Sequence, residues 1–300
     1  MWTDFGTQWI GLNASHKWEH HVNRFRTIFA SLALLGVASI ALSTEANAGE
    51  VLDRVLATKT LTAAVGTDWG KESFLNDKSE IDGLDPDVIK GIAKYLGVEP
   101  KFVTPSWELM VAGDWQGRWD VAMGAMVPTK ARAEKLSFPG IYFYARSVAV
   151  VHKDSKAQKL SDLNGKTIGA NVSTTDEFYV RHTLTPDWPD AKRVEYKLNP
   201  GEVKTYESYA IGLADLRLGD GVRLDALVVS DIAAQDAIKA GSPIRQLGDT
   251  LYAAPGAIAT LHGDKEFDEK IAAAIKSMRD DGTLSKLATK WYGVDVSTDY

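Results

Sequence analysis

The chain has 300 residues, of which 45% are hydrophobic, so it can bury a substantial core as one large domain or two smaller ones. The formal net charge is −6 and no long basic run occurs, which argues against a nucleic-acid partner. There are no cysteines, which excludes disulfides, thiolate zinc sites and cysteine nucleophiles together.

Residues 1–48 are predicted to be an N-terminal extension followed by a signal peptide that is removed on secretion. Arg24 and Arg26 precede an apolar run over 28–42, and Ala46-Asn47-Ala48 provides the small residues of a cleavage site. The run is shorter than the roughly twenty residues of a membrane span, and an uncleaved anchor is the alternative. The tryptophans and histidines over 1–21 are unusual for a signal peptide and suggest a true start at Val22. We therefore expect a periplasmic protein cleaved after Ala48.

The mature chain opens with alternating strand and helix patterns. A strand is predicted over 61–65, and a polar loop follows it. A helix with an apolar stripe comes next and ends at Gly97. A further strand over 101–103 runs on to Trp107, and a short helix ends at Gly117. This β-α-β-α order predicts a mostly parallel sheet with helices on its faces.

The stretch 119–138 carries the first candidate site. Residues 121–126 form a short apolar run typical of a buried strand, which Pro128 ends. Thr129 stands where a helix N-cap would, and a short helix is predicted over 130–135. Thr129 and Arg132 are three residues apart, so both can project toward one point and bind a carboxylate together with free backbone N–H groups. The alternative is an ordinary strand-to-helix turn with a solvated arginine.

The second half repeats this pattern. Strands are predicted over 147–152 and 167–170, and the Ser173–Asp176 segment opens a helix as Thr129 does. A long polar segment with three prolines is predicted to be loop, and a helix follows over 208–218. A strand over 223–229 leads to a helix at Ser230, and a last strand over 257–261 precedes two helices that end at Gly293. Ligands of open α/β sheets bind beyond the carboxyl ends of strands, so two such βα sets predict a ligand cleft between them.

The order of these motifs resembles the family 3 extracellular solute-binding proteins, the amino-acid receptors of bacterial ABC importers. The resemblance covers about 51–293. It rests on the order and spacing of short landmarks, each weak alone: Gly66-Thr67-Asp68, Gly83-Leu84-Asp85-Pro86-Asp87, Trp107-Glu108, Gly117-Arg118-Trp119-Asp120, Thr129-x-x-Arg132-Ala133-Glu134-Lys135, Leu163-x-Gly165-Lys166-Thr167, Ser173-Thr174-Thr175, Asp225-Ala226, Asp281-Gly282-Thr283 and Lys290-Trp291-Tyr292-Gly293.

The resemblance implies an α/β fold of the periplasmic-binding-protein type II class. Two lobes, each a mostly parallel sheet flanked by helices, would be joined by two crossover strands. Lobe 1 would comprise 49–147 and 253–300, and lobe 2 would comprise 148–252. Ligand binding would favour closure of the lobes, the state that an inner-membrane ABC permease recognises. The chain is expected to be a monomer that binds a small molecule without a metal or another cofactor.

The resemblance also assigns ligand-binding residues. Arg132 matches the arginine that pairs with the ligand α-carboxylate, with Thr129 beside it, and we expect Arg132 to face a wet cleft. Trp107 matches the aromatic residue that packs on the ligand side chain, with core packing as the alternative. Thr175, next to Thr174, matches the second-lobe group that completes carboxylate binding. The loop that contains Asp68 often contacts the ligand side chain, although Asp68 could serve only in a turn.

Three positions depart from the family pattern. Val127 stands where a serine is usual, so only its backbone could contact the ligand, and Lys71 stands where an aromatic residue is common. Ser230 occupies the usual position of the acid that binds the ligand ammonium, and Asp231 is one residue further along. Either Asp231 serves instead, or the anchor is lost and the ligand is a carboxylate other than an α-amino acid.

The expected function is therefore a non-catalytic receptor for an amino acid or related carboxylate. One alternative is a dehydratase-like or lyase-like enzyme on the same fold, for which Asp68, Glu72 and Asp231 are the available acids. The other is a ligand sensor for a different membrane partner. No catalytic triad, phosphate-binding loop or HExxH motif is present in the sequence. The mixed charge of the mapped cleft favours a polar or charged ligand.

Overall fold

The computed structural model describes residues 49–298, and the predicted extension, signal peptide and cleavage site lie outside them. Within 49–298 no helix combines the length and the apolar character that a membrane span requires. The larger strands are β1 (Thr60–Ala64), β4 (Glu99–Val103), β5 (Val121–Met126), β6 (Leu136–His152), β7 (Thr167–Asn171), β8 (Glu202–Tyr206), β9 (Ala226–Ser230) and β10 (Ile244–Leu261). The helices are α1 (Glu50–Thr58), α2 (Leu84–Leu96), α3 (Trp107–Ala112), α4 (Lys130–Ala133), α5 (Thr175–Val180), α6 (Tyr209–Leu216), α7 (Asp231–Lys239), α8 (Lys265–Asp280) and α9 (Thr283–Tyr292), with a 3-10 turn at Leu160–Leu163.

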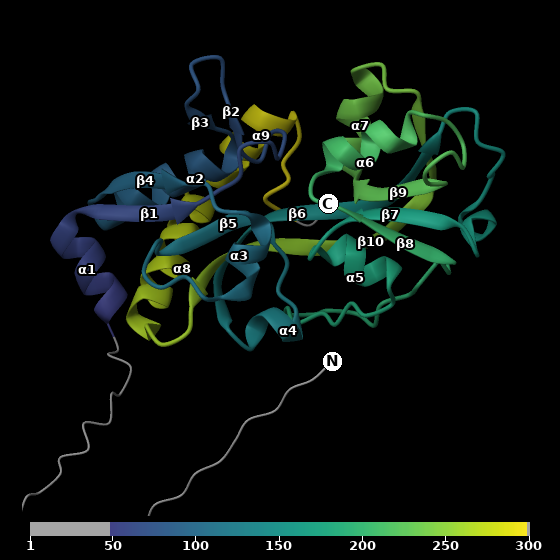
Figure 1. Cartoon of the computed structure of the whole chain (residues 1–300). Coiled ribbons are helices and arrows are strands. Elements are labelled where there is room, and N and C mark those ends of the chain that lie inside the picture. Colours follow the sequence, from purple (N-terminus) through teal and green to yellow (C-terminus); the bar gives the residue numbers. More distant parts are fainter. Residues whose placement is uncertain (1–48, 299–300) are drawn as a thin grey trace, which may run out of the picture. The chain divides into compact units, whose positions relative to one another are not determined.

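The larger strands form one eight-stranded sheet in the order β4-β1-β5-β10-β6-β9-β7-β8 (Figure 1). β4, β1 and β5 are parallel at one end of this order, and β9, β7 and β8 are parallel at the other. Between these groups, β10 and β6 pair with each other in an antiparallel manner. β10 is also antiparallel to β5, and β6 is antiparallel to β9. The two long strands therefore connect the two parallel groups.

Both faces of each parallel group are buried, as near-continuous apolar strands predict. Along β5, Val121 and Met123 join one hydrophobic cluster, whereas Ala122 and Met126 join another on the opposite face. Along β9, Ala226 and Val228 likewise separate from Leu227 and Val229. Successive strand residues point to opposite faces, so helices are needed on both sides. Figure 1 shows α6 and α7 on one side of the second group and α5 on the other.

The lengths of β6 and β10 differ from the prediction, which placed strands only over 147–152 and 257–261. β6 contains Pro139 and Gly140, and β10 contains Gly248, Pro255 and Gly256, residues that usually end strands. The β6–β10 ladder tolerates them because its register shifts between Leu247 and Tyr252 and again near Gly256. Residue propensity alone therefore underestimated the lengths of both strands.

Other elements were missed because tertiary contacts define them. The N-terminus of α1 is held by Asp264, whose carboxylate accepts hydrogen bonds from the backbone N–H groups of Val51 (2.8 Å) and Leu52 (3.0 Å). β8 lies in the segment predicted to be loop and pairs in parallel with β7. The predicted polar loop after β1 contains a small hairpin of β2 (Phe74–Leu75) and β3 (Ile81–Asp82).

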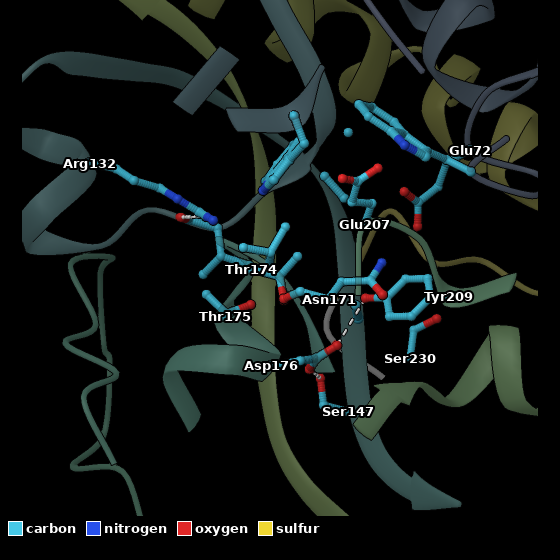
Figure 2. Close-up of a pocket in the computed structure, with 17 residues that line it drawn as sticks. Glu72, Arg132, Ser147, Asn171, Thr174, Thr175, Asp176, Glu207, Tyr209 and Ser230 are labelled. Atoms are coloured by element: carbon cyan, nitrogen blue, oxygen red, sulfur yellow. Dashed lines mark hydrogen bonds between the residues drawn. The ribbon is translucent and has the colours of Figure 1, made fainter. Parts of the chain in front are cut away.

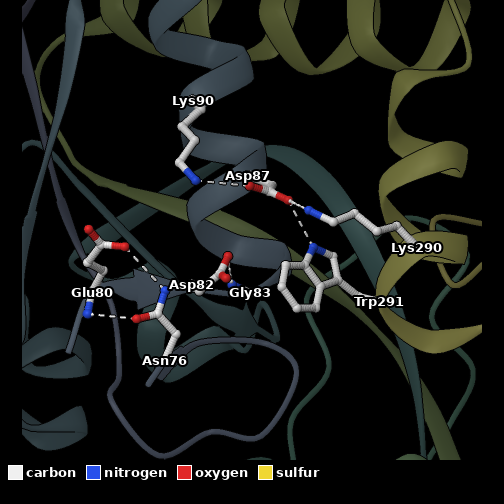
Figure 3. Close-up of polar contacts among 8 residues, drawn as sticks. All are labelled: Asn76, Glu80, Asp82, Gly83, Asp87, Lys90, Lys290 and Trp291. Atoms are coloured by element: carbon white, nitrogen blue, oxygen red, sulfur yellow. Dashed lines mark hydrogen bonds and ion pairs between the residues drawn. The ribbon is translucent and has the colours of Figure 1, made fainter. Parts of the chain in front are cut away.

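Two of the family landmarks meet where α2 contacts α9 (Figure 3). Asp87 in the first turn of α2 accepts hydrogen bonds from Lys290 Nζ (2.7 Å) and Trp291 Nε1 (3.0 Å) of α9, and from Lys90 Nζ (3.1 Å). Burial alone would raise the pKa of Asp87, but these donors outweigh it and hold the pKa below its ordinary value. Asp87 therefore joins two helices that are far apart in the sequence.

Candidate functional site

The carboxyl ends of four strands, two in each parallel group, adjoin one pocket. Its walls include Trp69 after β1, Val127 after β5, Thr175 after β7 and Ser230 at the end of β9. The cavity measures about 810 Å³, including open solvent at its mouth. Such positions are where open α/β sheets bind ligands, as the sequence predicted.

The pocket brings together part of the predicted set of ligand-binding residues. The structure places Trp107, Val127, Arg132, Thr174, Thr175 and Ser230 among the lining residues, and Figure 2 shows how several of them converge. Thr129, Asp68, Lys71 and Asp231 are not among the lining residues.

Arg132 is the basic side chain of the pocket wall. Thr129 N-caps α4 by accepting a hydrogen bond from the Arg132 backbone N–H (3.3 Å), as the sequence predicted, although α4 ends at Ala133 and is shorter than expected. Nη1 of Arg132 donates to the Val127 carbonyl (2.7 Å), and Nη2 donates to the Ser173 carbonyl (2.8 Å). Its Nε is buried and has no acceptor within the described chain.

The expectation that Arg132 faces a wet cleft is wrong, because the residue is only 5% exposed. Its guanidinium carbon lies 5.3 Å from the ring centre of Trp107 and 5.8 Å from that of Phe178. Burial lowers the pKa of Arg132 to about 10, which still leaves it cationic at neutral pH. A buried cation with a free donor is well suited to an anionic group of a ligand.

Two tryptophans form the aromatic part of the wall. Trp107 Nε1 donates to the same Ser173 carbonyl that Arg132 contacts (3.1 Å), and the rings of Trp69 and Trp107 meet edge to face with centres 5.6 Å apart. Gly124 leaves room for both rings, because a Cβ there would lie 2.6 Å from Trp69 and 2.9 Å from Trp107. The sequence signal for Trp69 is its place shortly after the end of a predicted strand.

The segment after β7 supplies the opposite wall. Thr174 N-caps α5 by accepting from the Glu177 N–H (3.4 Å) and donates its own hydroxyl hydrogen to the Asn171 carbonyl (2.7 Å). Ser173 has φ of 59°, a left-handed conformation that is uncommon for serine and turns the chain at the pocket. Thr175 is buried and lines the pocket at the start of α5.

At the end of β9 the structure distinguishes Ser230 from Asp231. Ser230 lines the pocket and also N-caps α7, accepting from the Ala233 N–H (3.2 Å). Oδ1 of Asp231 accepts from the N–H of Ile232 (2.8 Å), and Asp231 is not a lining residue. The extra strand residue that would bring Asp231 to the Ser230 position is therefore not seen.

Lys71 and Asp68 lie near the pocket rather than in its lining. Lys71 Nζ is 3.1 Å from each carboxylate oxygen of Asp236 on α7, so it links the loop after β1 to a helix of the other parallel group. Asp68 forms an isolated antiparallel bridge with Phe74. These contacts agree with a turn-forming role for Asp68.

Three carboxylates line the pocket, and none is among the ligand-binding residues predicted from the sequence: Glu72, Asp176 and Glu207. Asp176 is buried, and its carboxylate accepts hydrogen bonds from the hydroxyls of Ser147 (2.6 Å), Tyr252 (2.8 Å) and Tyr209 (2.9 Å). Its place directly after Thr175 is the local signal that could have identified it. In the sequence analysis Glu72 was an available acid for the enzyme alternative and one of the charged residues of the mapped cleft, without a ligand-binding role of its own.

Glu72 differs from Asp176 in its electrostatics. Burial, followed by the nearby Asp85 and Asp176 carboxylates, raises the pKa of Glu72 to about 8. Burial also raises the pKa of Asp85 to about 7, although Tyr142 donates to it (2.6 Å) and so does the Gly124 N–H (2.8 Å). In Figure 2, Arg132 lies at one side of the pocket and Glu72 at the opposite side, with Glu207 and Asp176 between them in that view.

Comparison with known proteins identifies the family. The family model for bacterial extracellular solute-binding proteins, family 3, matches residues 61–294. The L-cystine-binding protein TcyJ of Escherichia coli (strain K12) is 28% identical, over 88% of this chain and 96% of that protein.

Solved structures agree with this match. An ancestral arginine-binding protein bound to arginine is 28% identical, with a TM-score of 0.67 over 78% of this chain and 99% of that one. The ancestral amino acid-binding protein AncCDT-1, a precursor of cyclohexadienyl dehydratase, is 26% identical, with a TM-score of 0.68 over 80% of this chain and 99% of that one. The predicted type II periplasmic-binding-protein fold is thereby confirmed. The chain belongs to the bacterial extracellular solute-binding proteins of family 3.

Proposed function

We propose that this protein is a periplasmic receptor that binds an amino acid in the pocket beside Arg132 and delivers it to an ABC importer. The observation that carries the proposal is the buried Arg132 guanidinium, whose Nε lacks an acceptor within 49–298 although it belongs to a pocket wall. A ligand carboxylate would supply that acceptor. The family membership and the relatives that bind amino acids support the same function.

The α-carboxylate of the ligand would accept hydrogen bonds from Nε and Nη2 of Arg132. The Ser173 carbonyl, which now accepts from Nη2, would give up that contact. Thr175 lies in the same wall and would supply its hydroxyl. The ammonium group would then face Asp176, a lining carboxylate, in place of the Asp231 expected from the sequence.

The two parallel strand groups would act as lobes, with lobe 1 formed by 49–147 and 253–300 and lobe 2 by 148–252. Two observations support this division. The hydrophobic clusters that contain β1 and β5 are separate from those that contain β7 and β9, and the long β6 and β10 strands are shared. Closure would be favoured by the ligand's contacts with both walls, and the closed monomer would dock on an inner-membrane permease. A sensor role would use the same closure with a different membrane partner.

Catalysis has one observation in its favour, the raised pKa of Glu72, which suits a general acid near neutral pH. We propose binding without catalysis, because the pocket lining of the described chain holds no histidine or lysine that could act as a base beside Glu72. Proton NMR of a bound amino acid, incubated overnight with the protein, tests this. An unchanged spectrum supports the receptor, and a new product spectrum supports an enzyme.

The direct test of receptor function is a thermal-shift screen of the purified protein against the standard amino acids and simple carboxylates without an amine. At about one hundred times its Kd, a ligand adds roughly 2.7 kcal/mol to the apparent free energy of unfolding. A shift with one or more amino acids supports the proposal. Shifts confined to carboxylates without an amine would contradict the amino-acid assignment, and no shift at all would contradict receptor function.

Export is tested separately by sequencing the N-terminus of the protein recovered from the periplasm. We expect mature chains to begin at Gly49, after the proposed cleavage site. Recovery of the intact precursor in the membrane fraction would contradict cleavage.

A further inference from the structure

The charges of the pocket are unbalanced. Arg132 is the single basic side chain among the lining residues of the described chain, whereas Glu72, Asp176 and Glu207 are acidic. An α-amino acid with a neutral side chain carries one negative and one positive charge, so it would leave this imbalance unchanged. A ligand with one more positive charge would balance the Glu72 carboxylate once that group is ionised.

Glu72 and Glu207 are the lining acids whose carboxylates receive no hydrogen bond within 49–298, and Glu72 is the less exposed of the two. The Asp176 carboxylate has three hydroxyl donors, and that of Asp85 has the Tyr142 hydroxyl and the Gly124 N–H. In contrast, no group within 49–298 donates a hydrogen bond to the Glu72 carboxylate or forms an ion pair with it. The neighbouring Lys71 does not neutralise it, because Lys71 Nζ pairs with Asp236.

The position of Glu72 fits the far end of a bound amino acid. Figure 2 shows Arg132 and Glu72 on opposite sides of the pocket, with Glu207 between them in that view. An amino acid whose carboxylate contacts Arg132 would therefore extend its side chain toward Glu72. Trp69 and Trp107 line the space and would contact the methylene groups, and aromatic faces also attract cations.

We propose that the ligand is an amino acid with a positively charged side chain, and that Glu72 is the residue that selects it. This inference rests on the proposed receptor function, and it adds the chemical class of the ligand and the specificity-determining residue. The cationic end of the side chain would form a charge-assisted hydrogen bond with the Glu72 carboxylate.

Proton release gives this proposal a second readout. The charged and titratable groups around Glu72 are mostly acids and tyrosines, so the empty pocket favours its protonated form: Asp85 on α2, Tyr142 on β6, Asp176 on α5, Tyr209 on α6, and Glu207 and Arg132 in the lining. A cationic side chain would favour the carboxylate, so the Glu72 proton would pass to solvent on binding. Affinity for the cation would then rise with pH until the pH reaches the pKa of the empty site, about 8.

The test compares matched ligands by isothermal titration calorimetry. Arginine is paired with citrulline, and lysine with norleucine, because the members of each pair differ chiefly in side-chain charge. We expect the cationic member of at least one pair to bind about 10- to 100-fold more tightly, the range for a hydrogen bond to a charged group. Titrations in buffers of different ionisation enthalpy should show proton release near pH 7 for the cationic ligand.

Glu72→Gln is the decisive variant, because glutamine keeps the size of the side chain and cannot carry the charge. The ratio of the affinities for the cationic and the neutral member of the pair should fall to within a few-fold of one. Proton release on binding should be abolished. Glu99→Gln is the matched control, since it removes one negative charge from an exposed position on β4. It should preserve the preference for the cationic ligand and the proton release.

The outcomes separate the inference from the function on which it rests. Tight binding of neutral or acidic amino acids, with cationic ones excluded, would overturn the inference and leave the receptor function standing. An unchanged cationic preference in Glu72→Gln would overturn the role of Glu72. Failure of every amino acid to bind would overturn the amino-acid assignment of the receptor and the inference together.

Discussion

Nη2 of Arg132 lies 2.8 Å from the backbone carbonyl oxygen of Ser173, and this hydrogen bond joins the two parallel groups of strands across the pocket. Arg132 belongs to α4, directly after β5, whereas Ser173 follows β7. Trp107 Nε1 donates to the same oxygen from α3, the helix between β4 and β5 in the chain. The carbonyl therefore meets two donors, and under the proposed function a ligand carboxylate would compete with it for the guanidinium.

The ion pair of Lys71 and Asp236 also joins the two groups, at an exposed position. Both side chains are 38% exposed, so the pair should stabilise the closed form by at most about 1 kcal/mol. We expect Lys71→Ala and Asp236→Ala each to weaken ligand binding no more than about five-fold, mainly through faster dissociation. Stopped-flow measurements on both variants and the double variant check this. A double variant much weaker than either single variant would contradict direct pairing.

Gly124 shapes the aromatic wall, and its replacement should damage the pocket. Its φ of 101° disfavours other residues, and an added Cβ would press on the rings of Trp69 and Trp107. Gly124→Ala should lower the free energy of unfolding by about 1–3 kcal/mol and weaken ligand binding by at least about ten-fold. Gly117→Ala is the control for left-handed strain alone, because nothing lies near its added Cβ. Equal ligand affinity in both variants would contradict the packing argument.

Glu72 should make the empty protein less stable as the pH rises. Its pKa is raised from 4.5 to about 8, so between these values the folded state holds a proton that the unfolded state has lost. The free energy of unfolding must therefore fall as pH rises through this window. Glu72→Gln should remove this contribution and be more stable than the parent at pH 8, by about 1–2 kcal/mol after allowance for partial exposure.

Urea unfolding of the parent and the variant at several pH values measures this difference. The gain should shrink toward pH 5, where the parent's Glu72 is protonated in the folded state. Asp85, with its pKa raised to about 7, adds a slope of the same sign to both proteins, so only their difference reports Glu72. A variant less stable than its parent at pH 8 would contradict the account of Glu72.

Asp87 should show the opposite dependence on pH. Hydrogen bonds from Lys290, Lys90 and Trp291 hold its pKa below the ordinary 3.8, despite partial burial. Its contribution to stability is thus present above pH 3.8 and is lost as the pH falls through the lower folded pKa. Asp87→Asn should lower the free energy of unfolding by about 1–3 kcal/mol at pH 7.

Denaturant unfolding at pH 7 and at pH 3 checks this dependence, with Asp77→Asn at an exposed position as the control. The difference between Asp87→Asn and its parent should narrow at the lower pH, and ligand affinity near neutral pH should be unchanged. A deficit that stays the same at both pH values would show that packing, and not the charged hydrogen bonds, sets the effect.

The accuracy of the sequence predictions depended on how local the signal was. The β5 strand, the Thr129 N-cap and the Gly97 end of α2 follow from adjacent residues, and the structure confirms them. The α1 helix was missed although its apolar face, with Leu52 and Val55 buried, is local, and its N-terminus is held by Asp264, more than two hundred residues away. The breaker residues inside β6 and β10 are accommodated by shifts in strand register that sequence patterns do not reveal.

The residues of the pocket also differ in how far a local sequence signal could identify them. The order of family motifs brought attention to Arg132, Trp107 and Thr175, which all line it. The family spacing placed Ser230 at the position of the usual acid and left Asp231 as its substitute, and the lining residue at that strand end is Ser230. The acid side of the pocket comes from Glu72, Asp176 and Glu207, which follow three different strands, so only the folded sheet brings them to one cavity.

The most direct test of the central claim is calorimetric titration of the tightest-binding amino acid into Arg132→Ala. Removal of the guanidinium should cost about 2–5 kcal/mol of binding free energy. A loss of about 5 kcal/mol would make the binding of a micromolar ligand undetectable. Circular dichroism should confirm that the variant is folded, and Lys130→Ala, at an exposed position on α4, should bind as the parent does. Unchanged affinity in folded Arg132→Ala would contradict the account, because the carboxylate would then be held elsewhere.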